Sequence, residues 1–290
     1  MTFLQTKVFF LTICMLVFLT ACKEEEKIMS VRSIHEAQAK VDEILKIQKP
    51  KDVLVVLDID MTLTQPDHPG THYPAIKKYG HVLKDIFKTL TPAQRDVTLT
   101  LTTKLPQRLI EKDSPKAVKS MQDKGIKVIA FTACLSGSWK DSKDKTIFQR
   151  RDKLQTMGFN FSFPGRVVSY MNFPKHVDGF PMLYHGVLCA NGENNGIGKG
   201  KVLDAFLVQI HATKGSQTGG YVPKIIVMVD DKKANLEDVQ KVLAISHPDI
   251  LFIGIEYQGA FEHAPSDISE IDFTKFWEAL ADQAKLLCLG

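Results

Sequence analysis

The sequence predicts an α/β fold built on a doubly wound parallel sheet, and three observations lead to this prediction. Short, largely apolar runs at residues 53–57, 126–131 and 224–229 are typical of strands buried on both faces, as in parallel sheets. Amphipathic helical patterns lie between these runs, which indicates repeated βαβ units. Hydrophobic residues make up 44% of the 290 positions and charged residues 24%, so the chain can form a sizeable core.

The first 21 residues have the pattern of an export signal and are excluded from the fold. Lys7 precedes an apolar stretch at residues 8–19 that is too short to span a bilayer comfortably. The following Leu19-Thr20-Ala21-Cys22 resembles the lipobox of bacterial lipoproteins, in which the cysteine is acylated and becomes the new N-terminus. A lipid on Cys22 would tether the protein to a membrane of the cell envelope, on the periplasmic or surface side. The alternative is an ordinary secretory signal or an uncleaved anchor.

Residues 22–32 begin with a charged run, Lys23 to Lys27, and we interpret them as a tether. Residues 33–290 then form one domain. Ser33 and Glu36 have the spacing of a capping box, which predicts a helix from this point to about Gln48. Its apolar residues share one face, so we expect this helix to pack on the domain.

The rest of the domain alternates strands and helices around two insertions. The first insertion, at about 64–112, follows the first strand and contains helical patterns at 74–90 and 92–111, the second broken by Pro106. The second insertion, at about 159–196, includes β-like segments at 166–170 and 186–190. The remaining patterns predict helices at 114–125, 145–158, 202–211, 235–243 and from about 273, and a further strand at 250–255.

Charge and cysteine content exclude some functions. The net charge of +4 is slight for 290 residues, so no nucleic-acid partner is predicted. Cys134, Cys189 and Cys288 have no metal-ligand spacing, and we expect the first two to be small core residues.

Polar side chains follow three of the predicted strands. Asp58 and Asp60 end the first strand and project to the same side, because side chains alternate along a strand. Thr132 ends the second strand, and Asp230 and Asp231 end the third. The ends of parallel strands converge on one edge of the sheet, where ligands bind. Carboxylate oxygens suit Mg²⁺, which also accepts a substrate phosphate.

These residues also have structural interpretations. The first acidic pair would otherwise be a solvated strand end or a turn, and Thr132 would satisfy nearby backbone. Asp230 and Asp231 would cap the following helix, and which of the two meets a metal stays open.

Lys199 lies where a helix is predicted to begin. A cation at this end opposes the helix dipole, and this unfavourable placement indicates a function. Lys201 is the alternative candidate two positions later.

The order and spacing of these residues resemble those of the haloacid-dehalogenase-like phosphohydrolase superfamily. Its motifs are an Asp-x-Asp-x-Thr strand, a strand-end Thr or Ser, a Lys at a helix start and an acidic pair after a strand. Within residues 50–260 they read Asp58-Ile59-Asp60-Met61-Thr62, Phe131-Thr132-Ala133, Gly198-Lys199-Gly200 and Val229-Asp230-Asp231. The resemblance, to a bacterial lipoprotein branch of the superfamily, implies a Rossmann-like core with a helical cap after the first strand and a smaller second insertion.

The resemblance also implies a role for each residue. Asp58 would be the nucleophile that forms an aspartyl-phosphate, and Asp60 would protonate the leaving oxygen and then activate water. Thr132 would donate a hydrogen bond to a phosphoryl oxygen, and Lys199 would neutralise the nucleophile and the phosphate. Mg²⁺ would contact Asp58, the main-chain carbonyl of Asp60, Asp230 or Asp231, and the phosphate.

A membrane-tethered, Mg²⁺-dependent phosphatase acting on a small phosphorylated substrate is therefore the predicted function. The second acid of the motif favours phosphoryl chemistry, because a carbon–halogen bond needs no protonated leaving group. The first alternative is a non-catalytic lipoprotein that keeps the fold and binds a ligand or partner. The second is a receiver-like phosphorylated switch, which would place its acidic pair and phosphorylated Asp on different strands, unlike Asp58 and Asp60.

Five residues on loops or insertions near the motifs are candidate specificity contacts: His68, His72, Trp139, Lys140 and His176. Each has an alternative interpretation as a surface or packing residue.

Overall fold

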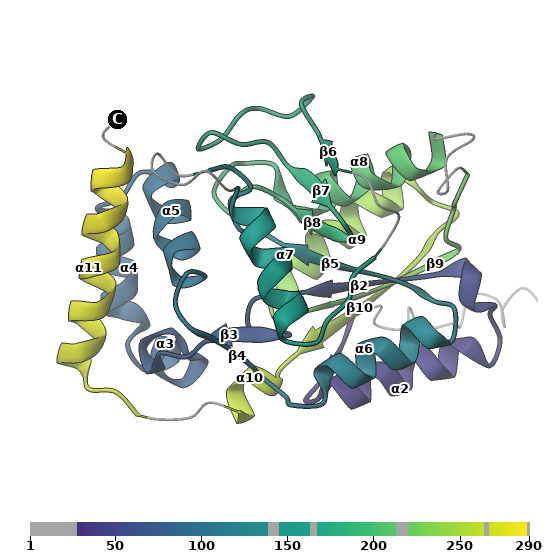
Figure 1. The fold of residues 1–290 in the computed structure, drawn as a ribbon, viewed down its shortest axis with the longest axis horizontal. Coiled ribbons are helices and arrows are strands. Elements are labelled where there is room, and N and C mark those ends of the chain that lie inside the picture. The colour runs from purple at the N-terminus through teal and green to yellow at the C-terminus, as the bar shows by residue number, and fades with distance from the viewer. Residues whose placement is uncertain (1–27, 139–144, 163–166, 213–219, 264–266, 289–290) are drawn as a thin grey trace, which may run out of the picture.

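The computed structural model describes residues 28–138, 145–162, 167–212, 220–263 and 267–288 (Figure 1). The signal-like segment, the lipobox with Cys22 and the charged run after it lie outside these residues, as do Trp139 and Lys140. In the part of the chain that is described, no helix combines the length and apolarity needed to cross a membrane.

An eight-stranded sheet lies at the centre of the molecule, in the order β1-β10-β9-β2-β5-β8-β7-β6. The strands β1, β10, β9, β2, β5 and β8 pair in parallel, and this confirms the predicted α/β class with a mostly parallel sheet. The strands are β1 (Ile28–Val31), β2 (Val53–Asp58), β5 (Lys127–Thr132), β6 (Val167–Ser169), β7 (Met182–Tyr184), β8 (Val187–Cys189), β9 (Ile225–Asp230) and β10 (Leu251–Tyr257).

The two edges of the sheet differ from the prediction. Residues 28–31, which we assigned to the tether, form β1 and pair in parallel with β10. At the other edge, β7 returns antiparallel to β8, and β6 pairs antiparallel to β7. The turn between β7 and β8 consists of His185 and Gly186, both with positive φ, and such a two-residue turn reverses the chain into a hairpin. This part of the predicted second insertion therefore extends the central sheet.

Helices cover both faces of the sheet (Figure 1). One face packs on α2 (Ile34–Leu45), α6 (Ser114–Asp123) and α7 (Thr146–Thr156), and the other on α8 (Gly198–Ala212) and α9 (Lys233–Ser246). Alternate residues of β2 enter the two cores: Val53, Val55 and Leu57 face the first group of helices, whereas Leu54 and Val56 face the second. The continuous apolar run in β2 thus reflects burial on both faces.

The predicted start of α2 is confirmed. The Ser33 hydroxyl accepts a hydrogen bond from the Glu36 N–H at 3.1 Å, as an N-cap does. The Glu36 carboxylate accepts from the Arg32 N–H at 2.9 Å, one residue before the position expected for a reciprocal capping box.

A helical cap stands beside the sheet and is formed by the first insertion together with the C-terminal helix (Figure 1). We define it as α3 (Tyr73–Lys78), α4 (Gly80–Lys88), α5 (Pro92–Thr102) and α11 (Glu270–Cys288). The single helix predicted over 74–90 is divided at Tyr79, whose ring is buried in the apolar core of the cap. Two short antiparallel strands, β3 (Thr64–Pro66) and β4 (Gln107–Leu109), join α3–α5 to the rest of the chain.

Three shorter elements complete the described chain: the 3₁₀ turns η1 (Pro50–Asp52) and η2 (Pro69–Thr71) and the short helix α10 (Gly259–Glu262). The turn η2 is tied to the cap because Trp277 of α11 donates its indole N–H to the Gly70 carbonyl at 2.9 Å.

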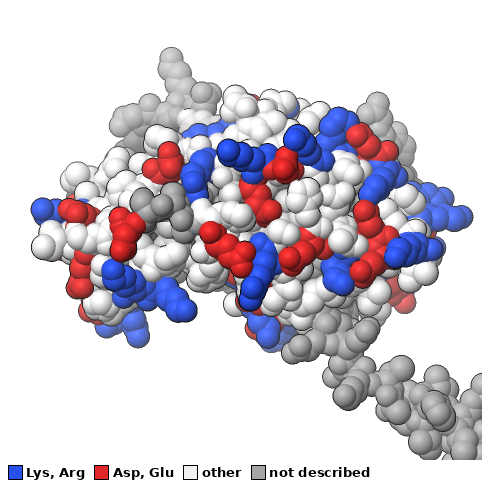
Figure 2. Space-filling view, turned by 90° about the horizontal axis from the view of Figure 1, so that it is seen from below, with Lys and Arg blue, Asp and Glu red and all other residues white. Residues whose placement is uncertain are grey.

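Basic and acidic side chains alternate on the face that Figure 2 shows. Surface ion pairs of the described chain include Lys124 with Asp42 at 2.6 Å and Lys119 with Asp123 at 2.6 Å. Exposed pairs of this kind contribute little to stability, and we assign them no function.

Acidification is expected to destabilise the cap through His72. The ring is buried, its Nε2–H donates to the Pro66 carbonyl at 2.9 Å, and its Nδ1 has no hydrogen-bond partner. Burial lowers the pKa of His72 below its usual 6.5. The unfolded chain therefore binds a proton below about pH 6.5 that folded His72 does not, and the free energy of unfolding falls by up to about 1.4 kcal/mol between pH 7.5 and 5.5.

Urea denaturation at the two pH values measures this effect. His72→Gln retains an N–H donor but has no titratable ring. Its free energy of unfolding should therefore fall less between pH 7.5 and 5.5 than that of wild type. His211→Gln changes an exposed residue of α8, and its free energy of unfolding should fall as much as that of wild type. An equal fall in wild type and His72→Gln would contradict the role of His72 in acid destabilisation.

Candidate active site

The predicted site residues come together at the carboxyl ends of three neighbouring strands. The strands β9, β2 and β5 are adjacent in the sheet and carry Asp230, Asp58 and Thr132 at their ends. Asp60 and Asp231 follow directly, and α8 begins at the same edge. Parallel strands explain this convergence, because all of them end on the same side.

Lys199 lies at the centre of the group. Its Nζ donates to Asp58 Oδ1 at 2.5 Å, to Asp230 Oδ2 at 2.7 Å and to the Phe131 carbonyl at 3.2 Å. Burial opposes the charge of Lys199, but Asp230 and Asp58 outweigh burial and raise the pKa of its ammonium group. The alternative candidate, Lys201, is exposed to solvent. The structure therefore places Lys199, and not Lys201, among the acidic residues.

The Asp58 carboxylate is buried and incompletely paired. Lys199 holds Oδ1, whereas Oδ2 has no hydrogen-bond partner. Burial raises the pKa of Asp58 well above its usual value, Lys199 counteracts this shift, and Asp230 adds to it. A buried carboxylate oxygen without a donor is unfavourable, so this atom is suited to a further cationic or electrophilic group.

Asp60 faces the same cavity but has different partners. The Thr132 hydroxyl donates to Asp60 Oδ2 at 2.9 Å, and Arg150 Nη2 donates to Asp60 Oδ1 at 2.5 Å. The Cys134 N–H in turn donates to the Thr132 hydroxyl oxygen at 3.1 Å. Met61 has a φ of 63°, so the chain turns sharply directly after Asp60.

Arg150 was not among the sequence-predicted residues. It lies in α7 and is buried on the same helical face as Ile147 and Leu154, three positions before it and four after it. An arginine on the apolar face of a helix is a signal that sequence inspection could have used. Burial opposes its charge, but the Asp60 carboxylate outweighs burial and raises the pKa of Arg150.

Asp230, the last residue of β9, contacts the core, whereas Asp231, the next residue, contacts the cap. Asp230 is fully buried, and its Oδ1 accepts from the Lys232 N–H and the Asn235 amide, both at 2.9 Å. Asp231 accepts a hydrogen bond from the Tyr73 hydroxyl of the cap. Burial and the neighbouring Asp230 raise the pKa of Asp231 to about 7. No pattern in the sequence connected Tyr73 with this pair.

The carboxylates form a donor set that fits a divalent cation. One oxygen from each of Asp58, Asp230 and Asp231 lies within 4.8 Å of the others. Lys199 supplies one positive charge beside these three acids, so a cation would reduce the remaining negative charge. The Asp60 carboxylate lies outside this donor set, and Thr132 and Arg150 hold it. The expected contact of its main-chain carbonyl with a metal stays a prediction.

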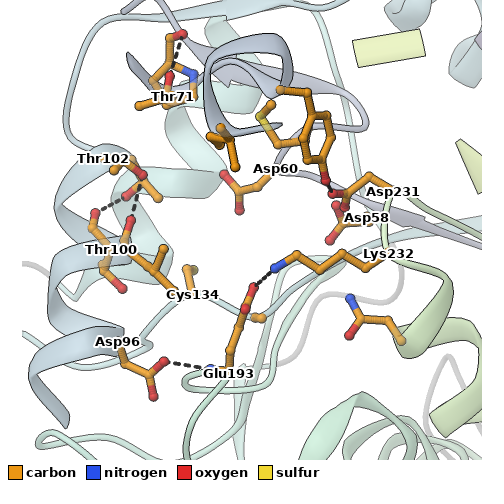
Figure 3. Close-up of a pocket in the computed structure, with 18 of the residues that line it drawn as sticks. Asp58, Asp60, Thr71, Asp96, Thr100, Thr102, Cys134, Glu193, Asp231 and Lys232 are labelled. Atoms are coloured by element: carbon orange, nitrogen blue, oxygen red, sulfur yellow. Dashed lines mark hydrogen bonds and ion pairs between the residues drawn. The ribbon is translucent and has the colours of Figure 1, made fainter. Parts of the chain in front are cut away.

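A cavity of about 310 Å³ opens beside these groups, between the sheet edge and the cap (Figure 3). Asp58, Asp60 and Asp231 lie close together on one side of it, and Asp96 and Glu193 lie across from them. The cavity is at the small end of the range found for small-molecule sites.

The chain matches one protein-family model over most of its length. The family model described as "Protein of unknown function (DUF2608)" matches residues 30–285. The chain belongs to the DUF2608 family. The chain is similar to an uncharacterized protein of Rickettsia felis, with 25% identity over 284 residues that cover 92% of this chain and 88% of the relative. It is also similar to an uncharacterized protein of Rickettsia conorii, with 24% identity over 287 residues and 90% of each chain covered. No solved structure matches.

In this DUF2608 protein, a second buried carboxylate joins the cap to the core. Asp96 of α5 accepts from His176 Nε2 at 2.8 Å, from the Glu193 N–H at 2.9 Å and from the Asn194 N–H at 3.0 Å and side-chain amide at 2.7 Å. Gly192 has a φ of 115°, and a Cβ at this position would overlap the Asp96 carboxylate. Asp96 therefore links the cap to the core beside the cavity.

The described candidate specificity residues of the DUF2608 chain have structural partners. His176 pairs with Asp96. His68 accepts from the Gly70 N–H at 3.1 Å and stacks on Phe276 with ring centroids 3.9 Å apart. His72 is buried and donates to Pro66. Their packing interpretation is therefore favoured.

Proposed function

We propose that this protein is a Mg²⁺-dependent phosphatase of the haloacid-dehalogenase-like type. One observation carries the proposal: Lys199 bonds to both Asp58 and Asp230, at the edge where Asp231 completes a set of three carboxylates. This is the combination of nucleophile, cation and metal ligands that phosphoryl transfer needs. The mostly parallel sheet, with a helical insertion after β2, agrees with the Rossmann-like core and cap that the resemblance implies.

In the first step, the Asp58 carboxylate attacks the phosphorus atom in line with the ester oxygen. The new O–P bond forms as the bond to the ester oxygen breaks, and a protonated Asp60 donates a proton to the leaving oxygen. Thr132 and Arg150 hold Asp60 in place beside Asp58. Lys199 neutralises the charge between Asp58 and the phosphoryl group.

In the second step, Asp60 accepts a proton from water, which attacks the aspartyl-phosphate. The O–P bond to Asp58 breaks, inorganic phosphate leaves, and the Asp58 carboxylate is restored. Arg150 holds Asp60 through its Oδ1 in this step as well. Asp58, Asp230 and Asp231 would hold Mg²⁺, which would supply positive charge to the phosphoryl oxygens.

We also propose that Cys22 carries a lipid, so that the domain acts on the exported side of a membrane. The support is the apolar stretch followed by Leu19-Thr20-Ala21-Cys22. Because β1 begins at Ile28, any tether between the lipid and the sheet would be short.

Phosphate release from an aryl phosphate tests the proposed chemistry. Wild type is expected to release phosphate with Mg²⁺ and to lose this activity with excess EDTA. Asp58→Asn keeps the size of the side chain but removes the nucleophile, and the rate should fall by at least about a thousandfold. Asp249→Asn changes an exposed aspartate and should match wild type.

Two outcomes would contradict the proposal. Equal rates in wild type and Asp58→Asn would remove Asp58 as the nucleophile. A folded wild type that releases no phosphate from a broad panel of esters would favour the non-catalytic binding lipoprotein.

A further inference from the structure

The cavity beside Asp58 has two chemically different walls. The wall at the sheet edge carries the acidic residues and Lys199, whereas the wall formed by the cap is largely apolar. Three helices of the cap contribute partly exposed apolar side chains to it: Ile76 of α3, Leu83 and Phe87 of α4, and Leu99 of α5. The buried ring of Trp277 from α11 also lines the cavity.

Three of the threonine hydroxyls that line the cavity already have acceptors within their own segments. Thr71 donates to the His68 carbonyl at 2.7 Å, Thr102 to the Leu99 carbonyl at 2.6 Å and Thr103 to the Thr100 carbonyl at 2.7 Å. These three hydrogens are therefore not available to polar groups of a ligand.

The charged side chains that line the cavity away from Asp58 are paired with protein groups. Lys232 bonds to Glu193 at 2.5 Å, and Asp96 accepts the hydrogen bonds from His176, Glu193 and Asn194 described above. Lys199 is held by Asp58 and Asp230. Of these two lysines, Lys199 lies beside Asp58, where the phosphate would bind, and Lys232 already has an acidic partner.

We propose that the cavity takes a phosphate monoester whose alcohol part is apolar and uncharged, such as a short alkyl or aryl group. The proposal rests on the function proposed above and specifies its substrate class. The phosphate would lie against Asp58 and Lys199, and the apolar part against Leu83, Phe87 and Leu99. A sugar or a second phosphate placed against Leu83, Phe87 and Leu99 would lose hydration, and these side chains offer it no hydrogen-bond partners. A volume of about 310 Å³ limits the ester to a small one.

Two matched series of compounds test the pocket and the chemistry separately. Straight-chain alkylphosphonates, from methyl to hexyl, contain a C–P bond that is not hydrolysed, so calorimetry with Mg²⁺ reports binding alone. The corresponding alkyl phosphates have leaving groups of similar reactivity, so their kcat/KM values report how the alcohol part is recognised. We expect phosphonate affinity and kcat/KM to rise by about threefold to fourfold per methylene until the chain reaches the end of the pocket.

Leu83→Gln introduces an amide into the cap wall with little change in helix propensity. In this variant, phosphonate affinity and kcat/KM should rise much less with chain length than in wild type. Leu286→Gln makes the same change at an exposed position of α11 and should keep the wild-type slopes. Glucose 6-phosphate and a bisphosphorylated sugar should be poorer substrates than hexyl phosphate.

The outcomes separate this inference from the proposed function. Hydrolysis that depends on Asp58 but does not change with chain length, or that favours the sugar phosphates, would overturn the apolar substrate class and leave the phosphatase intact. Phosphonate affinity that rises with chain length without any hydrolysis would support the pocket and overturn the proposed chemistry. Equal slopes in wild type and Leu83→Gln would remove the cap wall as the recognition surface.

Discussion

Lys199→Met is expected to be inactive and strongly destabilised. The substitution removes the one ammonium group that bonds to both Asp58 and Asp230, and it leaves two buried carboxylates facing each other. Loss of one partner from a buried ion pair typically costs about 3–5 kcal/mol of unfolding free energy. The rate of phosphate release should fall by at least about a hundredfold, because the charge that stabilises the transition state is gone.

Urea denaturation at neutral pH and phosphate release measure the two effects. Lys201→Met is the matched control, because it removes an exposed lysine two positions away in the same helix and should stay within about 0.5 kcal/mol of wild type. Mg²⁺ should restore part of the stability of Lys199→Met, because a ligand bound only by the folded state stabilises it. A Lys199→Met protein as stable and active as Lys201→Met would show that the buried pair has no such role.

Asp96→Ala is expected to detach the cap from the core. The carboxylate accepts hydrogen bonds from His176, Glu193 and Asn194, and its removal leaves these donors without a partner beside the cavity. A donor left unpaired in a buried site costs about 1–3 kcal/mol, so we expect Asp96→Ala to lose at least about 3 kcal/mol in unfolding free energy. Hydrogen exchange should rise in α5 and in residues 191–196 before it rises in the central strands.

Asp85→Ala is the control for this prediction. Asp85 lies exposed on α4 and pairs at 2.8 Å with Lys88 of the same helix. Such an exposed pair contributes less than about 1 kcal/mol. A loss below about 1 kcal/mol in Asp96→Ala, similar to that in Asp85→Ala, would show that other contacts hold the cap.

Local sequence patterns predicted a strand or helix correctly where a single pattern of burial determines the secondary structure. The apolar run of β2 indicated a strand buried on both faces, and its alternate residues enter two separate cores. The predicted helices at 114–125 and 145–158 correspond to α6 and α7 because one apolar face decides each of them. The helix predicted over 74–90 is divided at Tyr79, since the buried ring and the turn between α3 and α4 belong to the cap core.

The acidic residues of the candidate site could be predicted from the sequence, but several of the side chains that pair with them could not. Asp58, Asp60, Thr132 and Asp230 end neighbouring strands, so the parallel topology alone brings them together. Arg150 and Tyr73 approach the acids from α7 and α3, and no spacing in the sequence links either of them to a strand end. Asp96 likewise acquires its partners from segments about 80 and 100 positions away.

The sequence by itself determined the central strands β2, β5 and β9, their polar ends and the export signal pattern, because these depend on the order of residues within short windows. Only the tertiary structure decided that β1 closes one edge of the sheet, that α11 completes the cap and that Lys199 rather than Lys201 meets Asp58. It also decided that the wall facing Asp58 is apolar, because that wall is assembled from three helices of the first insertion and one at the far end of the chain. Contacts between distant segments depend on how the whole chain packs, and no local pattern encodes them.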